Sequence, residues 1–102
     1  MGCKVIISPR AIQDLEEIVR YISFDNGKAA ERFGYTLIDA ALSLATFPER
    51  GRFVPEFNDG KTRELIYGAY RIVYRVDLAK EAVFVSRFWH AARLLTAADA
   101  RS

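Results

Sequence analysis

With 102 residues, of which 51% are hydrophobic and 13% aromatic, the chain is long enough for one hydrophobic core and too short for a second. Its formal charge of +2 conceals an asymmetry, because residues 1–49 carry five basic and seven acidic side chains, whereas residues 50–102 carry ten basic and six acidic ones. Eleven of the fifteen basic residues are arginines, which suit planar recognition of carboxylate or phosphate groups. The second half of the chain therefore favours an anionic partner.

A single cysteine, Cys3, excludes a disulfide within the chain and a metal site built on several thiolates. The N-terminal residues lack the apolar core of a signal peptide, and no stretch approaches the roughly 18 apolar residues of a membrane span. We therefore expect a cytoplasmic protein that has no cofactor, no metal and no membrane partner.

The first predicted element is a short strand over residues 3–7, "CKVII", which ends at Ser8 and Pro9. Serine is a favoured helix N-cap and proline a favoured first helical residue, so a helix is predicted to begin there. Apolar residues follow at helical spacing, and this spacing places Asp14 on the outer face among other charged side chains.

A second helix is predicted to follow "DNG", residues 25–27, and to run to Phe47, where Pro48 ends it. Two amphipathic helices joined by a three-residue turn are expected to lie antiparallel. Residues 48–60 contain two prolines and two glycines, which predicts a crossing loop with a brief extended piece at residues 53–54.

Three β-rich runs complete the pattern: "TRELIY", "YRIVYRV" and "AVFVSRF". They are separated by Gly68-Ala69 and by residues 77–81, so they are expected to form an antiparallel meander. The predicted fold is a single α+β domain over residues 1–102, with an N-terminal strand, a two-helix hairpin and a three-stranded meander in one sheet (β-α-α-β-β-β). The remaining tail is expected to add a helical turn or to fray.

Side-chain alternation along "YRIVYRV" puts its tyrosines and Ile72 on the core face, and Arg71, Val73 and Arg75 on the other. If Gly68-Ala69 is a two-residue hairpin loop, Ile72 pairs with Leu65. If residues 77–81 form a five-residue loop, the next strand brings Val85 opposite Val73 and Arg87 opposite Arg71. Three arginines would then converge on the face away from the helices.

Like charges opposite one another destabilise a sheet, so the predicted contact between Arg71 and Arg87 requires compensation. Either Glu64 neutralises one arginine while the aliphatic stems cover the valines, or the face is a groove with an apolar floor and a basic rim for an anionic partner. The residues of this candidate binding surface are Arg63, Arg71, Val73, Arg75, Val85, Arg87, His90 and Arg93.

The segment "RFWHAAR" holds the only tryptophan and the only histidine of the chain. His90 has the pKa range needed for proton transfer at neutral pH, but a lone histidine near aromatic residues is more often a packed structural residue. Trp89 is expected in the core. No carboxylate or cysteine cluster surrounds His90, which disfavours a metal site.

Four segments together resemble the RelE/ParE superfamily of small bacterial toxins, the ParE branch most closely: "ISPRAIQDLEEIVRYI", "AAERFGYTLIDAALSLATFPERGRFVPE", "TRELIYGAYRIVYRV" and "VFVSRFWHAAR". The resemblance covers about Val5 to Arg93. It implies the toxin of a type II toxin–antitoxin pair, involved in plasmid stabilization and growth inhibition and neutralised by a cognate antitoxin. For the ParE branch it implies inhibition of DNA gyrase by protein contact, with no catalysis and no sequence-specific DNA binding by the toxin alone.

The resemblance to RelE-type members implies an alternative, a ribosome-dependent mRNA endoribonuclease using Arg71, His90 and Arg93. Such nucleases generally place a tyrosine or histidine near the C-terminus and lysines or a glutamate in the preceding strands. Here "TRELIY" offers Arg63 and Glu64 in place of lysines, and His90 is the single plausible base. These departures favour the non-enzymatic branch. A decayed toxin that only binds its antitoxin is a third possibility.

Overall fold

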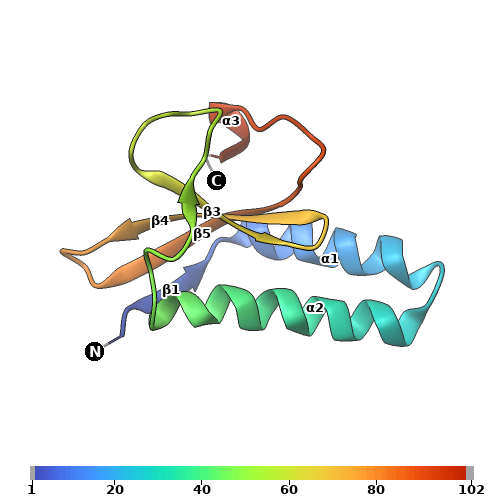
Figure 1. The fold of residues 1–102 in the computed structure, drawn as a ribbon. Coiled ribbons are helices and arrows are strands. Elements are labelled where there is room, and N and C mark those ends of the chain that lie inside the picture. The colour runs from blue at the N-terminus through green and yellow to red at the C-terminus, as the bar shows by residue number, and fades with distance from the viewer. Residues whose placement is uncertain (1, 101–102) are drawn as a thin grey trace.

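The computed structural model describes residues 2–100, which form one five-stranded sheet with a helical hairpin on one face (Figure 1). The strand order is β1-β5-β4-β3-β2, and β1 runs parallel to β5 while the other neighbours are antiparallel. This arrangement confirms the predicted α+β fold. The elements are β1 (Lys4–Ile7), α1 (Pro9–Ser23), α2 (Gly27–Leu42), the 3₁₀ turn η1 (Ser43–Ala45), β2 (Arg52–Phe53), β3 (Thr62–Tyr67), β4 (Tyr70–Asp77), β5 (Ala82–His90) and α3 (Ala97–Ala100).

Both long helices begin at side-chain caps. The Ser8 hydroxyl accepts a hydrogen bond from the Ala11 amide at 3.0 Å, and Pro9 occupies the first turn of α1, as predicted. Asn26 caps α2 in the same way. The second helix is shorter than predicted because it tightens into η1, and the carbonyl of Ala45 there accepts a hydrogen bond from the Cys3 amide at 2.7 Å, which ties the hairpin to the start of the sheet.

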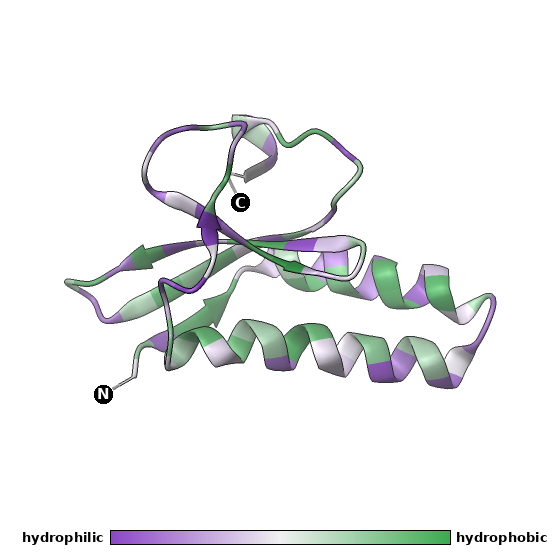
Figure 2. Cartoon of the chain, viewed as in Figure 1, coloured by the Kyte–Doolittle hydropathy of each residue, from purple (hydrophilic) through white to green (hydrophobic). Residues whose placement is uncertain are grey.

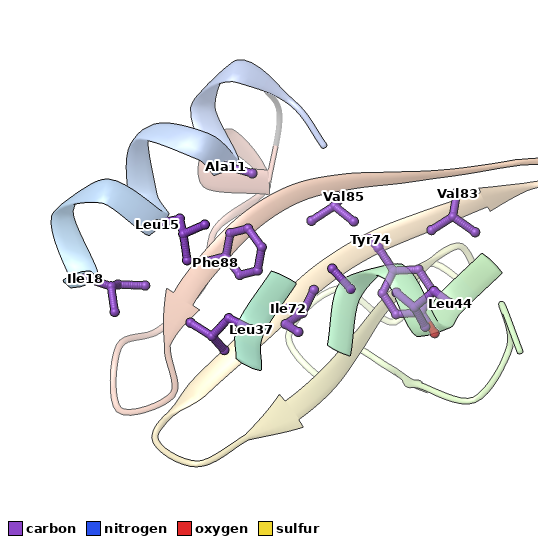
Figure 3. Close-up of a cluster of buried hydrophobic side chains, with 11 residues drawn as sticks. Ala11, Leu15, Ile18, Leu37, Leu44, Ile72, Tyr74, Val83, Val85 and Phe88 are labelled. Atoms are coloured by element: carbon purple, nitrogen blue, oxygen red, sulfur yellow. The ribbon is translucent and has the colours of Figure 1, made fainter. Parts of the chain in front are cut away.

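The main core lies between the helical hairpin and the sheet (Figure 3). Figure 2 shows apolar and polar residues mixed along both helices, as expected for amphipathic elements. Tyr74 is fully buried at the centre of β4, and its hydroxyl accepts a hydrogen bond from the Gly51 amide at 2.8 Å. The buried residues of this cluster are Ala11, Leu15, Ile18, Leu37, Ala41, Leu44, Ile72, Tyr74, Val83, Val85 and Phe88.

The opposite face of the sheet is covered by the loop between β2 and β3 and by the segment after β5 (Figure 1). A second, smaller apolar cluster lies beneath them. It consists of Val54, Val73, Trp89 and Leu95, with Phe57 packed against it. Trp89 is 3% exposed, which confirms its predicted place in a core.

The hairpin of β3 and β4 has the predicted register. Leu65 pairs with Ile72, and Gly68 has the positive φ of 57° that a two-residue loop requires. The predicted register between β4 and β5 is wrong. Asp77 still belongs to β4 and pairs with Ala82, so the loop has four residues and not five.

A bulge in β5 shifts this register further, because Val85 pairs with Tyr74 while Arg87 pairs with Val73. Arg71 therefore lies opposite Trp89 and not opposite Arg87. Val85 was expected beside Val73 on the candidate surface, but it is fully buried in the helix-side core.

Candidate functional site

Arg71 lies on the sheet face away from the helices, as predicted, but its charge is neutralised within the chain. Its guanidinium contacts both carboxylate oxygens of Glu56, with Nη1 at 3.0 Å from Oε1 and Nη2 at 2.9 Å from Oε2. Nη1 also lies 3.1 Å from Oε1 of Glu64, whose other oxygen accepts a hydrogen bond from Arg52 at 2.6 Å. Compensation of Arg71 by Glu64, one of the two expected arrangements, is therefore present.

Glu56 joins Arg71 to the segment that follows β5. Its Oε2 accepts a hydrogen bond from the Leu95 amide at 3.2 Å while the same carboxylate contacts Arg71. The hydrogen bond from Arg71 lowers the pKa of Glu56 below its ordinary value, although partial burial opposes the shift. The same hydrogen bond raises the pKa of Arg71.

Acid should weaken this contact, but only at a pH below the ordinary carboxyl range. Because the folded-state pKa of Glu56 is depressed, its contribution to stability is complete above the ordinary carboxyl pKa of about 4.3 and is lost as the pH falls through the folded value. We expect Glu56→Gln to flatten the acid limb of the stability curve, measured by urea unfolding between neutral pH and about pH 3. An unchanged acid limb would contradict this assignment.

Arg87 is held by helix α1. Its Nε and Nη2 donate to the two carboxylate oxygens of Asp14 at 2.6 and 2.9 Å, and the Phe88 amide donates to the same carboxylate at 3.2 Å. This contact is possible because β1 ends opposite Val85, so the last residues of β5 face α1. The hydrogen bonds that Arg87 donates to Asp14 raise the pKa of Arg87. The predicted outer-face position of Asp14 is wrong, since its side chain is 7% exposed.

Arg75 and Arg63 have separate surroundings. Arg75 is exposed, and its Nε donates to the Thr62 hydroxyl at 3.3 Å. Arg63 lies over the ring of Phe53, 4.1 Å from its centre, and donates to the Gly51 carbonyl at 2.7 Å. The arginines that were expected to converge, Arg71, Arg75 and Arg87, are therefore each held by a different part of the chain.

His90 and Arg71 lie on opposite faces of the sheet. His90 pairs with Tyr70, and their rings meet edge-on with centres 5.3 Å apart, whereas Arg71 pairs with Trp89. The Nδ1 atom of His90 accepts a hydrogen bond from the Ala92 amide at 3.1 Å. Because successive strand residues point to opposite faces, the His90 side chain points away from the face that carries Arg71, although the Nη2 atom of Arg71 lies 3.5 Å from the carbonyl oxygen of the next residue, Ala91.

Arg93 packs against Trp89. Its guanidinium lies 4.3 Å from the centre of the Trp89 ring, and its carbonyl accepts a hydrogen bond from the indole nitrogen at 3.0 Å. A polar depression of about 230 Å³ between β5 and α1 is lined by His90, Arg93 and Arg87, among others, but not by Arg71. Of the three residues considered for nuclease chemistry, this depression therefore brings together His90 and Arg93 but not Arg71.

An apolar groove of about 440 Å³ lies on the outer side of the helical hairpin. Gly34 allows the two helices to approach closely at its floor, since a Cβ there would lie 2.8 Å from the Cγ2 atom of Val19. Tyr35 is 63% exposed beside it. The groove is lined by Leu15, Glu16, Val19, Arg20, Glu31, Gly34, Tyr35 and Ile38.

Sequence reasoning missed two residues of these networks, Glu56 and Asp14. Glu56 lies in a loop, where no periodicity indicates its direction, and Asp14 is 73 residues from Arg87. Within residues 2–100 no group of three histidine, cysteine or acidic side chains could hold a metal ion. Over the same residues, every helix is too short or too polar to cross a membrane.

Comparison with known proteins shows to which family the chain is similar. A family model described as the ParE toxin of the type II toxin–antitoxin system parDE matches residues 5–95. The curated Toxin RelE2 of Caulobacter vibrioides is 37% identical over 91 residues, which cover 89% of this chain and 98% of that protein.

Two solved structures share the fold. The RelBE2 toxin–antitoxin complex of Mycobacterium tuberculosis aligns with a TM-score of 0.69 and 23% identity, over 88% of this chain and 99% of that one. The chromosomal ParDE system of P. aeruginosa aligns with a TM-score of 0.70 and 16% identity, over 87% and 96%. At these identities the structures support the fold alone.

Proposed function

This chain belongs to the ParE toxin family of type II toxin–antitoxin systems, and we propose that it inhibits DNA gyrase by binding it and is neutralised by a cognate antitoxin. In this proposal the toxin breaks no covalent bond and acts in the cytoplasm, where its target is. Gyrase is the target that resemblance to the ParE branch implies. The toxin class and an antitoxin partner follow from the family itself.

The separation of Arg71 from His90 is the observation that most supports a non-catalytic role. A nuclease needs a proton-transfer group within hydrogen-bond reach of the atoms that react, close to the cation that stabilises the charged phosphate. Here Arg71 is occupied by Glu56 and Glu64, and His90 lies on the other face of the sheet. A scissile phosphate held by Arg71 would therefore lie on the face of the sheet opposite to the His90 side chain.

The alternative is a RelE-type endoribonuclease that cuts mRNA on the ribosome. The name of the 37% identical relative, Toxin RelE2, favours this second candidate. In that case the ribosome would have to rearrange the site, because His90 and Arg93 line the polar depression without Arg71.

Expression of the toxin without its antitoxin separates these candidates. We expect gyrase-dependent DNA breaks, filamentous cells and intact mRNA, and we expect His90→Ala to remain fully toxic because His90 performs no chemistry. The measurements are mapping of mRNA 5′ ends and recovery of gyrase–DNA cleavage complexes.

Codon-positioned mRNA cuts that disappear in His90→Ala would establish the endoribonuclease and reject the gyrase proposal. Normal growth at an expression level confirmed by immunoblot would indicate a decayed toxin. Lys80→Ala is a suitable control, because Lys80 is exposed in the loop between β4 and β5, at the end of these strands opposite to the Tyr70–His90 pair.

A further inference from the structure

The outer face of the helical hairpin carries apolar side chains that face solvent. The loop of residues 54–61 and the segment that follows β5 both lie on the opposite face of the sheet (Figure 1). Ile12 and Leu42 are exposed one helical turn beyond the groove that α1 and α2 form, and Tyr35 is exposed beside it. These side chains extend the groove into an apolar strip, and contiguous apolar surface of this kind marks an interaction site.

Two opposite charges flank the groove. Arg20 lies on its α1 side and Glu31 on its α2 side. Residues 19 and 34 are level in the hairpin, because a Cβ at Gly34 would lie 2.8 Å from Cγ2 of Val19. Arg20 and Glu31 therefore lie about 1.5 and 4.5 Å from that level, both towards the turn between the helices. Among residues 2–100, neither side chain takes part in an ion pair.

This arrangement of charge is self-complementary. A two-fold axis parallel to the groove places α1 of one copy over α2 of another, and each Arg20 then meets Glu31 of the other copy. The same rotation brings Ile12 against Leu42 of the second copy, because residues 12 and 42 are nearly level at the other end of the hairpin. Each copy thus offers both halves of the contact.

The charges of the groove also disfavour an anionic occupant. Its lining carries the carboxylates of Glu16 and Glu31 and the single guanidinium of Arg20. A nucleic acid or an anionic membrane would be repelled by the two carboxylates, since like charges brought together across an interface are unfavourable. A surface with matched charges of both signs fits better, and this chain presents one.

We propose that the groove of the helical hairpin binds a second copy of this chain, in a symmetric dimer in which Tyr35 of each copy packs into the groove of the other. Tyrosine supplies a large apolar contact and is frequent among the residues that dominate interfaces. The ion pairs between Arg20 and Glu31 lie at the rim, where they set the register more than the affinity. The proposal goes beyond the action of the toxin on its target and does not depend on which target that is.

The size of the face predicts a weak dimer. Helices of 15 and 16 residues present a surface about 24 Å long, and two of them side by side are about 18 Å wide. Each copy can therefore bury about 400 Å², or about 800 Å² for the pair, which is at the low end for specific complexes. We expect a dissociation constant in the micromolar range.

Sedimentation velocity of the purified full-length chain over a range of concentrations tests this proposal. We expect Tyr35→Ser and Arg20→Glu each to raise the dissociation constant of the dimer about tenfold. The double reversal, Arg20→Glu with Glu31→Arg, should restore the native value, because the two rim charges only exchange places. Arg32→Glu is the matched control, since it makes the same change of charge at an exposed position of α2 that does not line the groove. Its dimer should be unaffected.

Hydrogen exchange measured by mass spectrometry locates the interface independently. Raising the concentration of the native chain should slow exchange in α1 and α2 and leave the hairpin of β3 and β4 unchanged. Tyr35→Ser should lose this dependence on concentration while its circular dichroism spectrum stays native, because Tyr35 is exposed in the single chain.

A native chain that remains monomeric at high micromolar concentration would overturn the proposal. So would a dimer that persists in Tyr35→Ser and Arg20→Glu, because a different face would then form it. If exchange in α1 and α2 slows only in a complex with the antitoxin, the groove belongs to the antitoxin and the dimer is rejected. None of these measurements involves gyrase or the ribosome, so the proposed target stands or fails by its own test.

Discussion

Asp14→Ala is expected to destabilise the protein by about 3–5 kcal/mol, the usual cost of removing one partner from a buried ion pair. The Arg87 side chain is 8% exposed, and both of its short contacts to a carboxylate are with Asp14. Without Asp14 the guanidinium would remain buried without its counter-charge, and the Phe88 amide would lose its acceptor. A loss of this size is a large fraction of the stability of a small domain.

Urea unfolding followed by circular dichroism measures this loss. Glu17→Ala is the control, because Glu17 is exposed on the same helix, and we expect a change below about 0.5 kcal/mol. The double variant Asp14→Leu with Arg87→Met should recover much of the stability, since apolar replacement of both partners leaves no buried charge unpaired. A loss below about 1 kcal/mol in Asp14→Ala would mean that Arg87 reaches water and that the pair is only a surface contact.

The elements of the fold were predictable because their signals are local. Ser8 and Pro9 mark the start of α1 by side-chain and backbone chemistry that does not depend on the rest of the chain. The register of β3 against β4 was equally accessible, because a two-residue loop at Gly68 permits one pairing.

The register of β5 was not predictable in the same way. The loop before it closes with Glu81 at a positive φ of 49°, a conformation that glycine or asparagine would have indicated and glutamate does not. The bulge near Ser86 also carries no glycine, so side-chain alternation wrongly placed Val85 with Arg87. Glu81 and the bulge near Ser86 thus shift β5 so that Arg87 does not lie opposite Arg71, where the sequence had predicted it.

The candidate site was predictable only where partners are close in the sheet. Glu64 and Arg71 lie on adjacent strands, so their contact followed from the hairpin register. Glu56 and Asp14 reach their arginines through tertiary packing of a loop and a helix, which no spacing rule describes. The direction in which the arginines of β4 point was therefore easier to predict than what they contact.

Gly51→Ala is the second substitution with a large expected effect, because no space exists for a Cβ atom at this position. That atom would lie 2.5 Å from the Tyr74 hydroxyl and 2.6 Å from the Glu64 carbonyl, both of which are held in buried strands. Overpacking of this kind costs about 1–3 kcal/mol or more. The glycine of the "FPERGR" turn is thus required by the packing of Tyr74 beneath it.

Thermal or urea unfolding of Gly51→Ala should show this loss, whereas Gly27→Ala should be neutral or slightly stabilising, since a Cβ at Gly27 meets nothing within 4 Å. Tyr74→Phe alone should cost about 1 kcal/mol, because the Gly51 amide would lose its acceptor. Combined with Gly51→Ala, the same change should cost less, because the displaced loop has already broken that hydrogen bond and the removed hydroxyl relieves part of the clash. The Glu64 carbonyl belongs to the backbone and remains, so the double variant should stay below native stability. Strict additivity would show that Gly51 and Tyr74 do not share one packing constraint.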